Sequence, residues 1–598
     1  TDIYNALKNA RQKNYDEVDV WVDYDSNDLI ESDWVTVEDT ATWSDADTSA
    51  SLSNESTSSE PYTTLPVSSG DYSNTNLRDQ KVDEADIVKT DGKNLYIIQK
   101  DQYLTIVKAD KENSEVLSRT ALYASSDSDP EVPFLLQGGD SLTSQSIEEL
   151  FISGDHLILL VRESVNDPGH WNDKYFTRIV TLDISDLSCP SVLGNISQDG
   201  SYSQARRIGD TTYLYTTKTV YVEDKKKDTD LAVTIGDQEL SPKSFCIPNV
   251  VTSQDYLIFS AISDADPSDI TDAGVFVSGA DNFYISENSL YVLNSYYENS
   301  NSNSQISRIS LEDGTFHGIA SCVLSGYINN TWSVDEYQGN LRVLITYNTR
   351  DLAKFLSSLL TGNSLSYSLS RSQGSRMNAL LILDAHLQTV SKLVGIGKNE
   401  EIKSARFMGD TAYFVTYQNT DPLFCADLSD PKNPTLLGEL EITGFSSYLH
   451  PFGADRLLGI GYETDPVSGR TKGLKFTMFD TSDPGNLKPV HTYVLNGVTS
   501  CPAINNYKSI FISPEKNLFG FYYDDRYLLY AYDESDGFSN AGIYDLLIAG
   551  YSGLSSPSTV RGLYIGDEFY LAGPSYVTGF SLSGDSDREF ALDTFPET

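Results

Sequence analysis

The chain has 598 residues, long enough for several ordinary domains or for one large domain built from repeats. It carries 86 acidic and 42 basic side chains, which give a formal net charge of −44 at pH 7. This charge argues against nucleic-acid binding, which needs a cationic surface, and against docking on an anionic membrane; it favours solubility or attraction for cations.

A short helix is predicted at the start of the chain. In the stretch TDIYNALKNARQKN, apolar side chains recur at helical spacing, at Ile3, Leu7 and Ala10. Asp2 precedes them as a candidate N-cap. We therefore expect residues 1–40 to contain an amino-terminal helix and an acidic segment.

The next segment has the composition of a flexible linker. Residues 41–75 hold sixteen Ser or Thr in 35 positions and few apolar side chains. No Lys or Arg occurs between Lys13 and Arg78. Because such a segment cannot bury enough apolar surface to order itself, residues 41–75 are predicted to be an acidic, Ser/Thr-rich linker.

From residue 76 the chain changes to short strands rich in Tyr, Ile, Leu and Val, separated by Gly, Asn and Asp. A pattern of strand, tight turn and strand recurs nine times, and the turns contain the residues that adopt positive φ in hairpins. The nine copies span residues 87–98, 150–161, 206–217, 283–294, 334–345, 406–417, 450–461, 511–522 and 563–574. This recurrence indicates a repeat architecture.

A second hairpin follows several of the first ones. TLDISDLSCPSVLGNI (181–196), CADLSDPKNPTLLGEL (425–440) and MFDTSDPGNLKPVHTY (478–493) each predict a strand, an Asx/Pro turn and a strand, and looser versions occupy 308–320 and 381–393. Two hairpins make a four-stranded antiparallel sheet with two apolar faces, which is stable only between neighbouring sheets. The sequence thus predicts an all-β fold, a single large β-propeller with eight or nine blades over residues 76–598. An array of β-sandwiches is the alternative.

Several segments resemble a known family. TNLRDQKVDEADIVKTDGKNLYII (75–98) is close to the family's hallmark at the start of the propeller, although Asp79 and Gln80 depart from the usual pattern; further matches are ARRIGD (205–210), SARFMGDTAYFVTY (404–417) and RGLYIGDEFYL (561–571). The chain resembles secreted or membrane-anchored bacterial and archaeal proteins with a β-propeller domain distantly related to WD-type repeats. The biochemical role of that family is uncharacterised. The resemblance covers nearly everything from residue 75 onward.

The resemblance also implies a location. The opening DIYNALKNAR and the acidic spacer are similar to the stretch that follows the membrane segment in anchored members of the family. The chain begins at Thr1 without a Met and contains no run of about 20 apolar residues. We therefore expect no transmembrane segment in this chain, a targeting segment or membrane tether before it, and a secreted or cell-surface-anchored protein.

No catalytic motif is apparent. The sequence contains no G-x-S-x-G, no H-E-x-x-H, no P-loop and no complete G-x-G-x-x-G. The five cysteines are too far apart for a structural zinc site and are expected to be buried thiols, with one disulfide as the alternative. Propeller enzymes assemble sites from distant blades, so missing motifs do not exclude an enzyme.

Two arginines and one histidine are candidate ligand-binding residues. Arg206 and Arg406 each precede a turn aspartate, Asp210 or Asp410, by four residues, and even spacing places both on the same face of their strands. They are predicted either to bind an anionic ligand in the channel or, as we favour, to form Arg–Asp pairs between neighbouring blades. His450 begins an inner hairpin and is expected either to face the channel or to pack at a strand end.

Aromatic and acidic side chains supply two further candidate groups. Trp171 and Trp332 follow loop-like segments and are candidate platforms for a ligand, although most aromatic side chains are expected to fill the gaps between blades. Four carboxylates at the start of the propeller are candidate oxygen ligands for calcium, with solvated acids or ion pairs as the alternative. These four residues are Asp83, Glu84, Asp86 and Asp91.

From the sequence we therefore expect a non-enzymatic extracellular or cell-surface module that binds or scaffolds a protein or a glycan. One alternative is a hydrolase or lyase with its site in the central channel. The other is a structural surface protein stabilised by a cation such as calcium.

Overall fold

The fold is described from a computed structural model of the chain. The structure describes residues 2–16, 37–38, 71–73, 76–79, 81–123, 132–136, 142–166, 173–223, 225, 229–298, 301–349, 375–417, 421–465, 468–546, 556, 558–582 and 589–595. Nearly all of the predicted linker, residues 41–75, lies outside the described residues.

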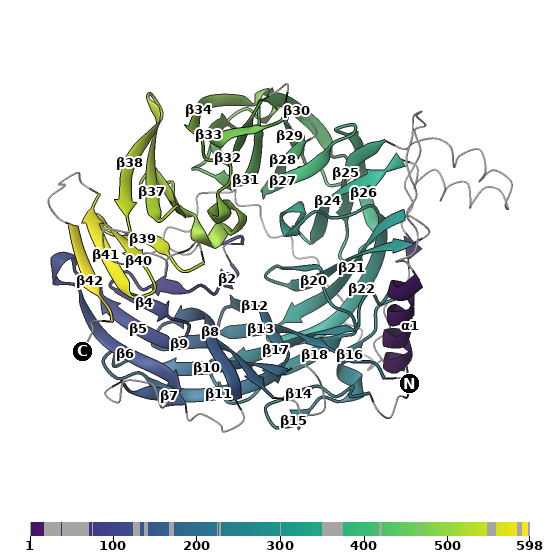
Figure 1. The fold of residues 1–598 in the computed structure, drawn as a ribbon. Coiled ribbons are helices and arrows are strands. Elements are labelled where there is room, and N and C mark those ends of the chain that lie inside the picture. Colours follow the sequence, from purple (N-terminus) through teal and green to yellow (C-terminus); the bar gives the residue numbers. More distant parts are fainter. Residues whose placement is uncertain are drawn as a thin grey trace.

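The described strands form nine sheets arranged in a ring, so the protein is a nine-bladed β-propeller (Figure 1). We number the blades one to nine in chain order. Each of the nine predicted hairpins forms two neighbouring strands of one blade, on the side of the central channel (Figure 1). The prediction of nine repeated units is confirmed, and the alternative of separate sandwiches is wrong.

The first three blades carry additional short strands. Blade one contains β3 (Val88–Thr90), β4 (Asn94–Gln99), β5 (Tyr103–Lys108), β6 (Glu115–Tyr123) and β7 (Phe134–Leu136). Blade two contains β8 (Leu142–Ser153), β9 (His156–Val165), β10 (Lys174–Asp183), β11 (Ser191–Asp199), β14 (Thr234–Ile235) and β15 (Gln238–Glu239). Blade three contains β2 (Asp83–Glu84), β12 (Ser201–Ile208), β13 (Thr211–Thr219), β17 (Asp255–Ser263), β18 (Asp272–Phe276) and β16 (Phe245–Cys246).

The middle blades are more regular. Blade four contains β19 (Asn282–Ile285), β20 (Ser289–Glu298), β21 (Asn301–Glu312) and β22 (Thr315–Ser325), with β1 (Val37–Glu38) at its outer edge. Blade five contains β23 (Val334–Tyr337), β24 (Asn340–Asn348), β25 (Arg376–Leu383) and β26 (Thr389–Ile396). Blade six contains β27 (Glu401–Met408), β28 (Thr411–Tyr417), β29 (Asp421–Asp427) and β30 (Thr435–Ile442).

The last three blades have four strands each. Blade seven contains β31 (Phe445–Pro451), β32 (Arg456–Thr464), β33 (Thr471–Asp480) and β34 (Lys488–Asn496). Blade eight contains β35 (Phe511–Ser513), β36 (Leu518–Tyr523), β37 (Arg526–Asp533) and β38 (Gly537–Asp545). Blade nine contains β39 (Arg561–Ile565), β40 (Glu568–Ala572), β41 (Tyr576–Ser581) and β42 (Glu589–Asp593).

The turns form for the reasons that their sequences suggest. In the inner hairpins of blades three and six, Gly209 and Gly409 adopt φ values of +56° and +54°, which glycine adopts without steric cost. In an outer hairpin, the carboxylate of Asp427 accepts a hydrogen bond from the backbone N–H of Ser429 at 2.9 Å. This Asx turn is the local structure that the DLSDP motif predicts.

Burial between blades closes the ring. All six residues of β4 are buried, so the second strand of blade one has no solvent-exposed face. Leu95 and Ile97 of β4 belong to one hydrophobic cluster with Tyr570 and Val577 of blade nine. The first and last blades are therefore joined by apolar packing, as each sheet requires on both of its faces.

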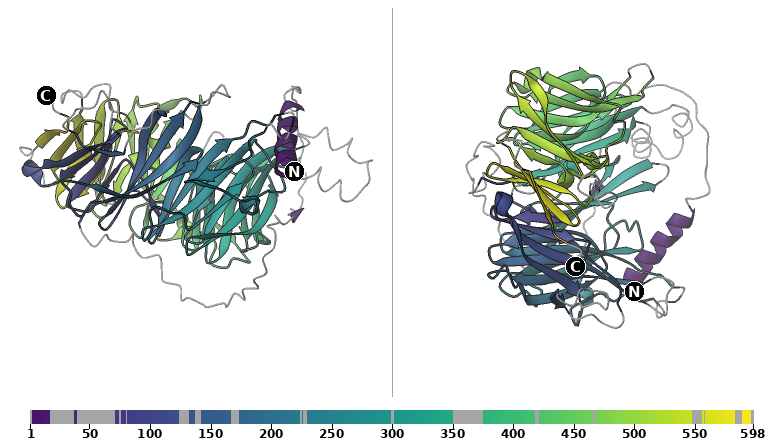
Figure 2. Two further views of the ribbon diagram at one scale, coloured as in Figure 1. Left: turned by 90° about the horizontal axis from the view of Figure 1, so that it is seen from below. Right: turned by 60° about the vertical axis from the view of Figure 1, so that its left-hand side comes forward.

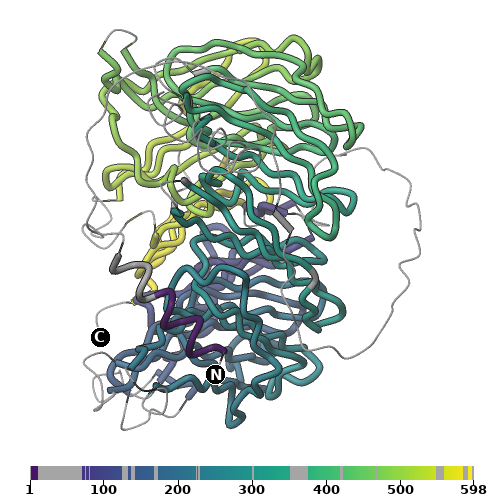
Figure 3. The backbone as a smooth tube through the Cα atoms, turned by 90° about the vertical axis from the view of Figure 1, so that its right-hand side faces the viewer, coloured from purple at the N-terminus to yellow at the C-terminus, as the bar shows by residue number. Residues whose placement is uncertain are grey.

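The amino-terminal helix α1 (Asp2–Asp16) lies at the periphery of the ring (Figures 2 and 3). Its apolar side chains Tyr4 and Leu7 are buried in a cluster that includes Tyr256 of blade three. The helix is confirmed, but it begins at Asp2, which therefore lies in the first turn and is not the N-cap. Within the described part of the chain, no helix is long and apolar enough to cross a membrane.

All five cysteines are free thiols, so the predicted alternative of a disulfide is wrong. Cys189 is exposed, and the other four are buried. Burial raises the pKa of Cys246 to about 12. The buried thiols therefore behave as small apolar side chains.

Candidate functional site

Residues 71–73, 76–79 and 81–87, which we call the crossing segment, run across the central channel before the chain enters blade one (Figure 1). Tyr72 forms a backbone bridge with Ile565 of blade nine, and β2 pairs with β12 of blade three. Asp86 forms a further bridge with Leu150 of blade two. The strand β2 accordingly lies near the centre of the ring (Figure 1).

Side chains attach the crossing segment to further blades. The Nδ2 of Asn76 donates to the hydroxyl oxygen of Tyr448 in blade seven at 3.0 Å. The Nζ of Lys81 lies 2.7 Å from Oε2 of Glu287, in the loop between the first two strands of blade four. The crossing segment is therefore part of the propeller's core and connects blades on opposite sides of the ring.

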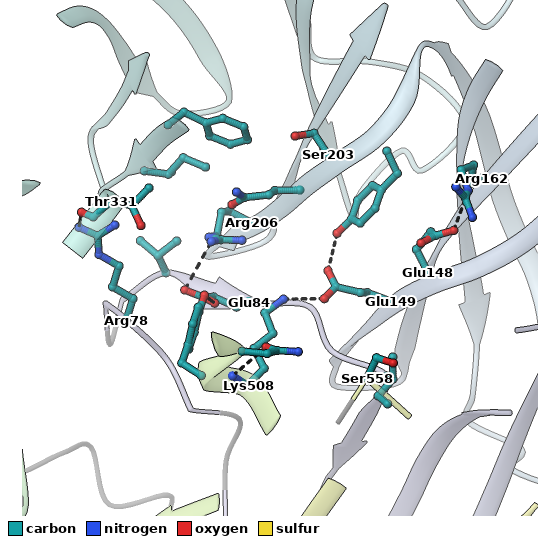
Figure 4. Close-up of a pocket in the computed structure, with 18 of the residues that line it drawn as sticks. Arg78, Glu84, Glu148, Glu149, Arg162, Ser203, Arg206, Thr331, Lys508 and Ser558 are labelled. Carbon is teal, nitrogen blue, oxygen red and sulfur yellow. Dashed lines mark hydrogen bonds and ion pairs between the residues drawn. The ribbon is translucent and has the colours of Figure 1, made fainter. Parts of the chain in front are cut away.

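Glu84 anchors the centre of the crossing segment. Its side chain is 2% exposed, lies 3.5 Å from Arg206 of blade three and accepts a hydrogen bond from the Tyr507 hydroxyl (Figure 4). Burial by itself raises the pKa of Glu84, but Arg206, Lys508 and the Tyr507 hydrogen bond together hold it below its ordinary value. Glu84 is thus a buried carboxylate that stays ionised because cations surround it.

Asp86 forms a second buried ion pair. Its Oδ1 lies 3.0 Å from the guanidinium of Arg561 in β39, and the two side chains are 4% and 8% exposed. The pair joins the end of the crossing segment to blade nine. A buried pair of this kind is weak evidence for stability in itself, but the loss of either partner leaves an uncompensated buried charge.

Three cavities lie against the crossing segment. The main cavity, of about 660 Å³, is lined by five basic and five acidic side chains. It also has five aromatic rings in its wall: Tyr202, Phe283, Tyr284, Trp332 and Tyr507. The second cavity, of about 430 Å³, contacts Asp83 and Asp86. The side cavity, of about 490 Å³, contacts Trp332 and Arg406.

Two β-bulges shape the wall of the main cavity. The pairing of β8 with β9 shifts between Ile147 and Glu149, and the pairing of β12 with β13 shifts between Tyr202 and Gln204. A bulge interrupts the alternation of side chains along a strand. Consecutive residues, including Glu148 and Glu149, therefore line the same cavity.

A hydrogen-bond chain connects three side chains that line the main cavity, Tyr202, Glu149 and Lys508 (Figure 4). The Tyr202 hydroxyl donates to Oε2 of Glu149 at 2.5 Å, and the Nζ of Lys508 donates to Oε1 at 2.6 Å. The same Nζ donates to the backbone carbonyl of Ala85 at 2.7 Å. Both carboxylate oxygens of Glu149 therefore already accept hydrogen bonds within the protein, one of them from the positively charged Lys508.

Arg78 lies where the main and side cavities meet. Its guanidinium donates to the backbone carbonyls of Thr331 and Val334 and lies 4.2 Å from the ring centroid of Tyr284. It is also 5.3 Å from the ring of Trp332. Burial lowers the pKa of Arg78, although the surrounding tyrosines and acids oppose that effect.

The structure places two of the predicted binding residues at the main cavity and one at the side cavity. Arg206 and Trp332 line the main cavity, and Arg406 lines the side cavity with its guanidinium 5.2 Å from the Trp332 ring. Trp171 lies outside the described residues. The inter-blade Arg–Asp pair that we favoured is not formed by Arg206, because β2 occupies the edge of β12 and presents Glu84 instead.

His450, the other predicted binding residue, is 4% exposed and lines none of the three cavities described above. Its Nδ1 lies 3.0 Å from the Tyr448 hydroxyl. Burial, with a contribution from Arg406, holds the pKa of His450 well below its ordinary value of 6.5. The histidine is therefore a neutral, packed residue at the end of β31.

The structure does not bring the four predicted calcium ligands together. Asp83 pairs with Lys89 at 2.8 Å, Glu84 and Asp86 pair with arginines, and Asp91 accepts from the backbone N–H of Lys93. Successive side chains of a strand point to opposite sides, so neighbours in sequence are separated in space. In the part of the chain that the structure describes, no three His, Cys, Asp or Glu side chains are grouped to hold a metal.

Sequence reasoning missed several residues of the main cavity, among them Arg78, Glu149, Tyr202 and Lys508. One of them carries a signal in the sequence, because Arg78 is the first basic residue after Lys13. The others depend on the bulges and on the path of the crossing segment. Those features have no pattern of their own in a single sequence.

Comparison with known proteins identifies similar chains. Residues 72–584 match the family described as Beta propeller domain. An uncharacterized protein of Methanocaldococcus jannaschii is 29% identical over 520 residues, which cover 78% of this chain and 74% of that protein. An uncharacterized protein of Archaeoglobus fulgidus is 31% identical over 253 residues, which cover 42% of this chain and 33% of that protein.

Proposed function

Because the chain belongs to the Beta propeller domain family, whose relatives named above are uncharacterized, we propose a function from the main cavity. The protein is a non-enzymatic binding module, and its ligand is a saccharide that enters this cavity. The proposal rests on one observation, a cavity of about 660 Å³ that combines aromatic rings with a balanced set of charged side chains.

The size of the cavity favours a small ligand or the end of a chain over a folded protein. Ligand pockets are typically about 300–1,000 Å³, whereas a stable protein interface covers roughly 800 Å² on each partner. Four of the large exposed apolar side chains, which a protein interface would use, lie on outer strands: Leu193, Val394, Leu436 and Ile543. These residues come from blades two, five, six and eight and line none of the three cavities described above.

The lining favours a ligand with many hydroxyl groups. Tyrosine and tryptophan present an apolar face together with a polar edge, which suits the mixed surface of a sugar ring. The charged groups supply many donors and acceptors at fixed positions, and five basic side chains balance five acidic ones. The cavity therefore matches a polar ligand that needs no net compensating charge.

The pairing of the carboxylates supports binding over hydrolysis. Glu84 is held ionised beside Arg206, and Glu149 accepts from Tyr202 and Lys508. A glycosidase needs one carboxyl group with a raised pKa to protonate the leaving oxygen. Glu84 has the opposite shift. Burial raises the pKa of Asp79, which also lines the main cavity, so this argument applies to Glu84 and not to every carboxyl group there.

We also propose that the protein acts outside the cell, at the surface. The support is the acidic composition of residues 1–75 and the resemblance of the opening residues to a stretch that follows a membrane segment. Mild proteolysis of intact cells of the source organism should remove the protein. Its persistence until the cells are lysed would refute this location.

A glycan array probed with the full chain tests the proposed function, with a peptide array in parallel. Glycans that bind are then titrated by calorimetry against Arg162→Ala, which removes an exposed cavity side chain that pairs with Glu148 at 2.9 Å. Loss of one charged hydrogen bond to the ligand weakens binding about tenfold or more. Arg526→Ala removes an exposed arginine that lines none of the three cavities and should leave the affinity unchanged.

The two arrays decide between ligand classes. Binding of glycans that Arg162→Ala weakens and Arg526→Ala does not would support the proposal. Binding of peptides alone would replace the saccharide with a protein ligand. Hydrolysis of a bound glycan by the native protein would restore the enzyme alternative.

A further inference from the structure

Arg406 differs from the other arginines of the channel. It belongs to β27, is 7% exposed and lines the side cavity. Its Nε has no hydrogen-bond partner. Among the residues that the structure describes, no carboxylate lies within ion-pair distance of this guanidinium. A buried cation without an acceptor is costly to the folded protein.

Comparable arginines of other blades have carboxylate partners. Arg206 lies 3.5 Å from Glu84, and Arg561 lies 3.0 Å from Asp86. The guanidinium of Arg342, which also lines the side cavity, donates to its own blade's Asp335. Each of these arginines therefore has a carboxylate partner. Arg406 has none among the residues that the structure describes.

The Trp332 ring fixes the position of the guanidinium without satisfying it. The ring lies 5.2 Å from Arg406 and 5.3 Å from Arg78. A guanidinium near an aromatic face is held by the ring quadrupole, and its N–H donors remain free to bind acceptors in its own plane. Arg406 thus offers preorganised donors at the wall of the side cavity.

The charges of the side cavity limit the ligand to a single negative charge. Four basic and four acidic side chains line it. The acids are largely occupied, since Asp335 accepts from Arg342 and Glu287 pairs with Lys81 at 2.7 Å. One additional carboxylate would pair with Arg406, whereas a phosphate or sulfate dianion would bring a second negative charge into a cavity that four carboxylates already line.

We propose that Arg406 and Trp332 form a subsite for the carboxylate of an acidic sugar, of the uronic acid type. The main and side cavities share Arg78 and Trp332 in their walls and therefore adjoin, and the proposal places one saccharide chain across both. The planar fork of arginine matches a carboxylate with two parallel hydrogen bonds. This inference rests on the proposed saccharide function and adds the chemical class of the ligand.

Ligand-observed NMR on the full chain tests the subsite with glucuronate, glucose and acetate as probes. The native protein should bind glucuronate about tenfold or more tightly than glucose, because the carboxylate adds charge-assisted hydrogen bonds. Arg406→Gln should reduce this ratio to about one. Arg406→Lys, which keeps the charge but not the fork, should give an intermediate ratio, and Arg526→Gln should leave it unchanged.

The melting temperature provides a second test, because a structural role of Arg406 predicts that its replacement destabilises the protein, whereas a binding role does not. Arg406→Met removes an unpaired buried charge, so the ligand-free variant should unfold at a temperature no lower than the native protein. A clear loss of thermal stability in this variant would show that Arg406 has a structural acceptor and would overturn the subsite.

The probes separate failure of the subsite from failure of the proposed function. Equal binding of glucose and glucuronate would overturn the carboxylate subsite and leave saccharide binding intact. Binding of acetate that Arg406→Gln abolishes, without binding of either sugar, would support the carboxylate site and overturn the saccharide function. Absence of binding by all three probes would overturn the subsite.

Discussion

The buried pair between Asp86 and Arg561 gives the sharpest stability prediction. Asp86→Asn removes the negative charge with little change in volume and deprives a guanidinium that is 8% exposed of the Asp86 carboxylate. Breaking a buried pair from one side costs about 3–5 kcal/mol. The exposed pair of Lys81 and Glu287, with side chains 70% and 42% exposed, is a matched control, because surface pairs contribute about 0–1 kcal/mol.

The expected change in melting temperature follows from the size of the protein. For 598 residues at about 2.1 cal/mol/K per residue, the entropy of unfolding is about 1.3 kcal/mol/K. A loss of 3–5 kcal/mol therefore lowers the melting temperature by about 2–4 °C if the ring unfolds as a unit.

Calorimetry of Asp86→Asn, Arg561→Met and the double variant measures the coupling between the two residues. The double variant should be less destabilised than the sum of the single variants by about 1–3 kcal/mol, because each single variant breaks the pair from one side whereas the double variant removes both partners. Glu287→Gln should shift the melting temperature by less than 1 °C, on the order of what the surface value allows. Additive effects, or a shift for Asp86→Asn no larger than that of Glu287→Gln, would refute the reasoning.

Three further predictions follow. His450 is neutral in the folded protein because burial and Arg406 hold its pKa well below 6.5, so the unfolded chain takes up a proton first as the pH falls. The free energy of unfolding should therefore decrease below about pH 6.5, by up to about 1.4 kcal/mol per pH unit. Denaturant unfolding at pH 7.5 and 5.5 measures this dependence, and His450→Gln should reduce it. The same pH dependence in the variant and the native protein would contradict the prediction. Cys189 should be the single thiol that a maleimide labels rapidly in the native protein, with five labelled in urea, and rapid labelling of a second native thiol would disagree with the burial of the other four. Leu7→Ala should destabilise the docking of α1 by about 2–5 kcal/mol and speed proteolysis within residues 2–16. Asn9→Ala, on the exposed face of the helix, is the control and should leave the rate of proteolysis unchanged. Equal rates in the two variants would mean that α1 does not pack as described.

The sequence predicts the propeller because its information is local and repeated. Glycine turns such as Gly209 and Gly409 and Asx turns such as Asp427 with Ser429 fix hairpins within a few residues. Nine such units, with strands that are apolar on both faces, leave a closed ring as the architecture that buries them. The sequence left the blade count at eight or nine, and the structure decides for nine because each hairpin becomes the inner pair of one blade.

The path of the crossing segment was not predictable in the same way. Glu84 and Asp86 read as solvated acids or cation ligands, because their partners Arg206 and Arg561 are about 120 and 475 residues away. Pairing across such separations has no periodicity that one sequence reveals. The carboxylates are buried only because the channel contributes arginines from several blades.

The candidate site was only partly predicted for the same reason. Arg206 and Arg406 stand at repeated positions, and their similar spacing drew attention to both. Their roles differ because β2 supplies Glu84 to one of them, while the other faces Trp332 without an acid. The residues that complete the cavity, such as Glu149, are aimed by a β-bulge that the strand pattern does not encode.

Hydrogen–deuterium exchange of residues 81–88 tests the central claim most directly, namely that the crossing segment is part of the propeller core. The backbone N–H of Asp86 donates to Leu150 at 3.2 Å and β2 pairs with β12, so these amides should exchange as slowly as those of β20. Exchange as fast as in the exposed turn at Asp524 would mean that the crossing segment does not occupy the channel. The three cavities that lie against this segment would then not exist as described.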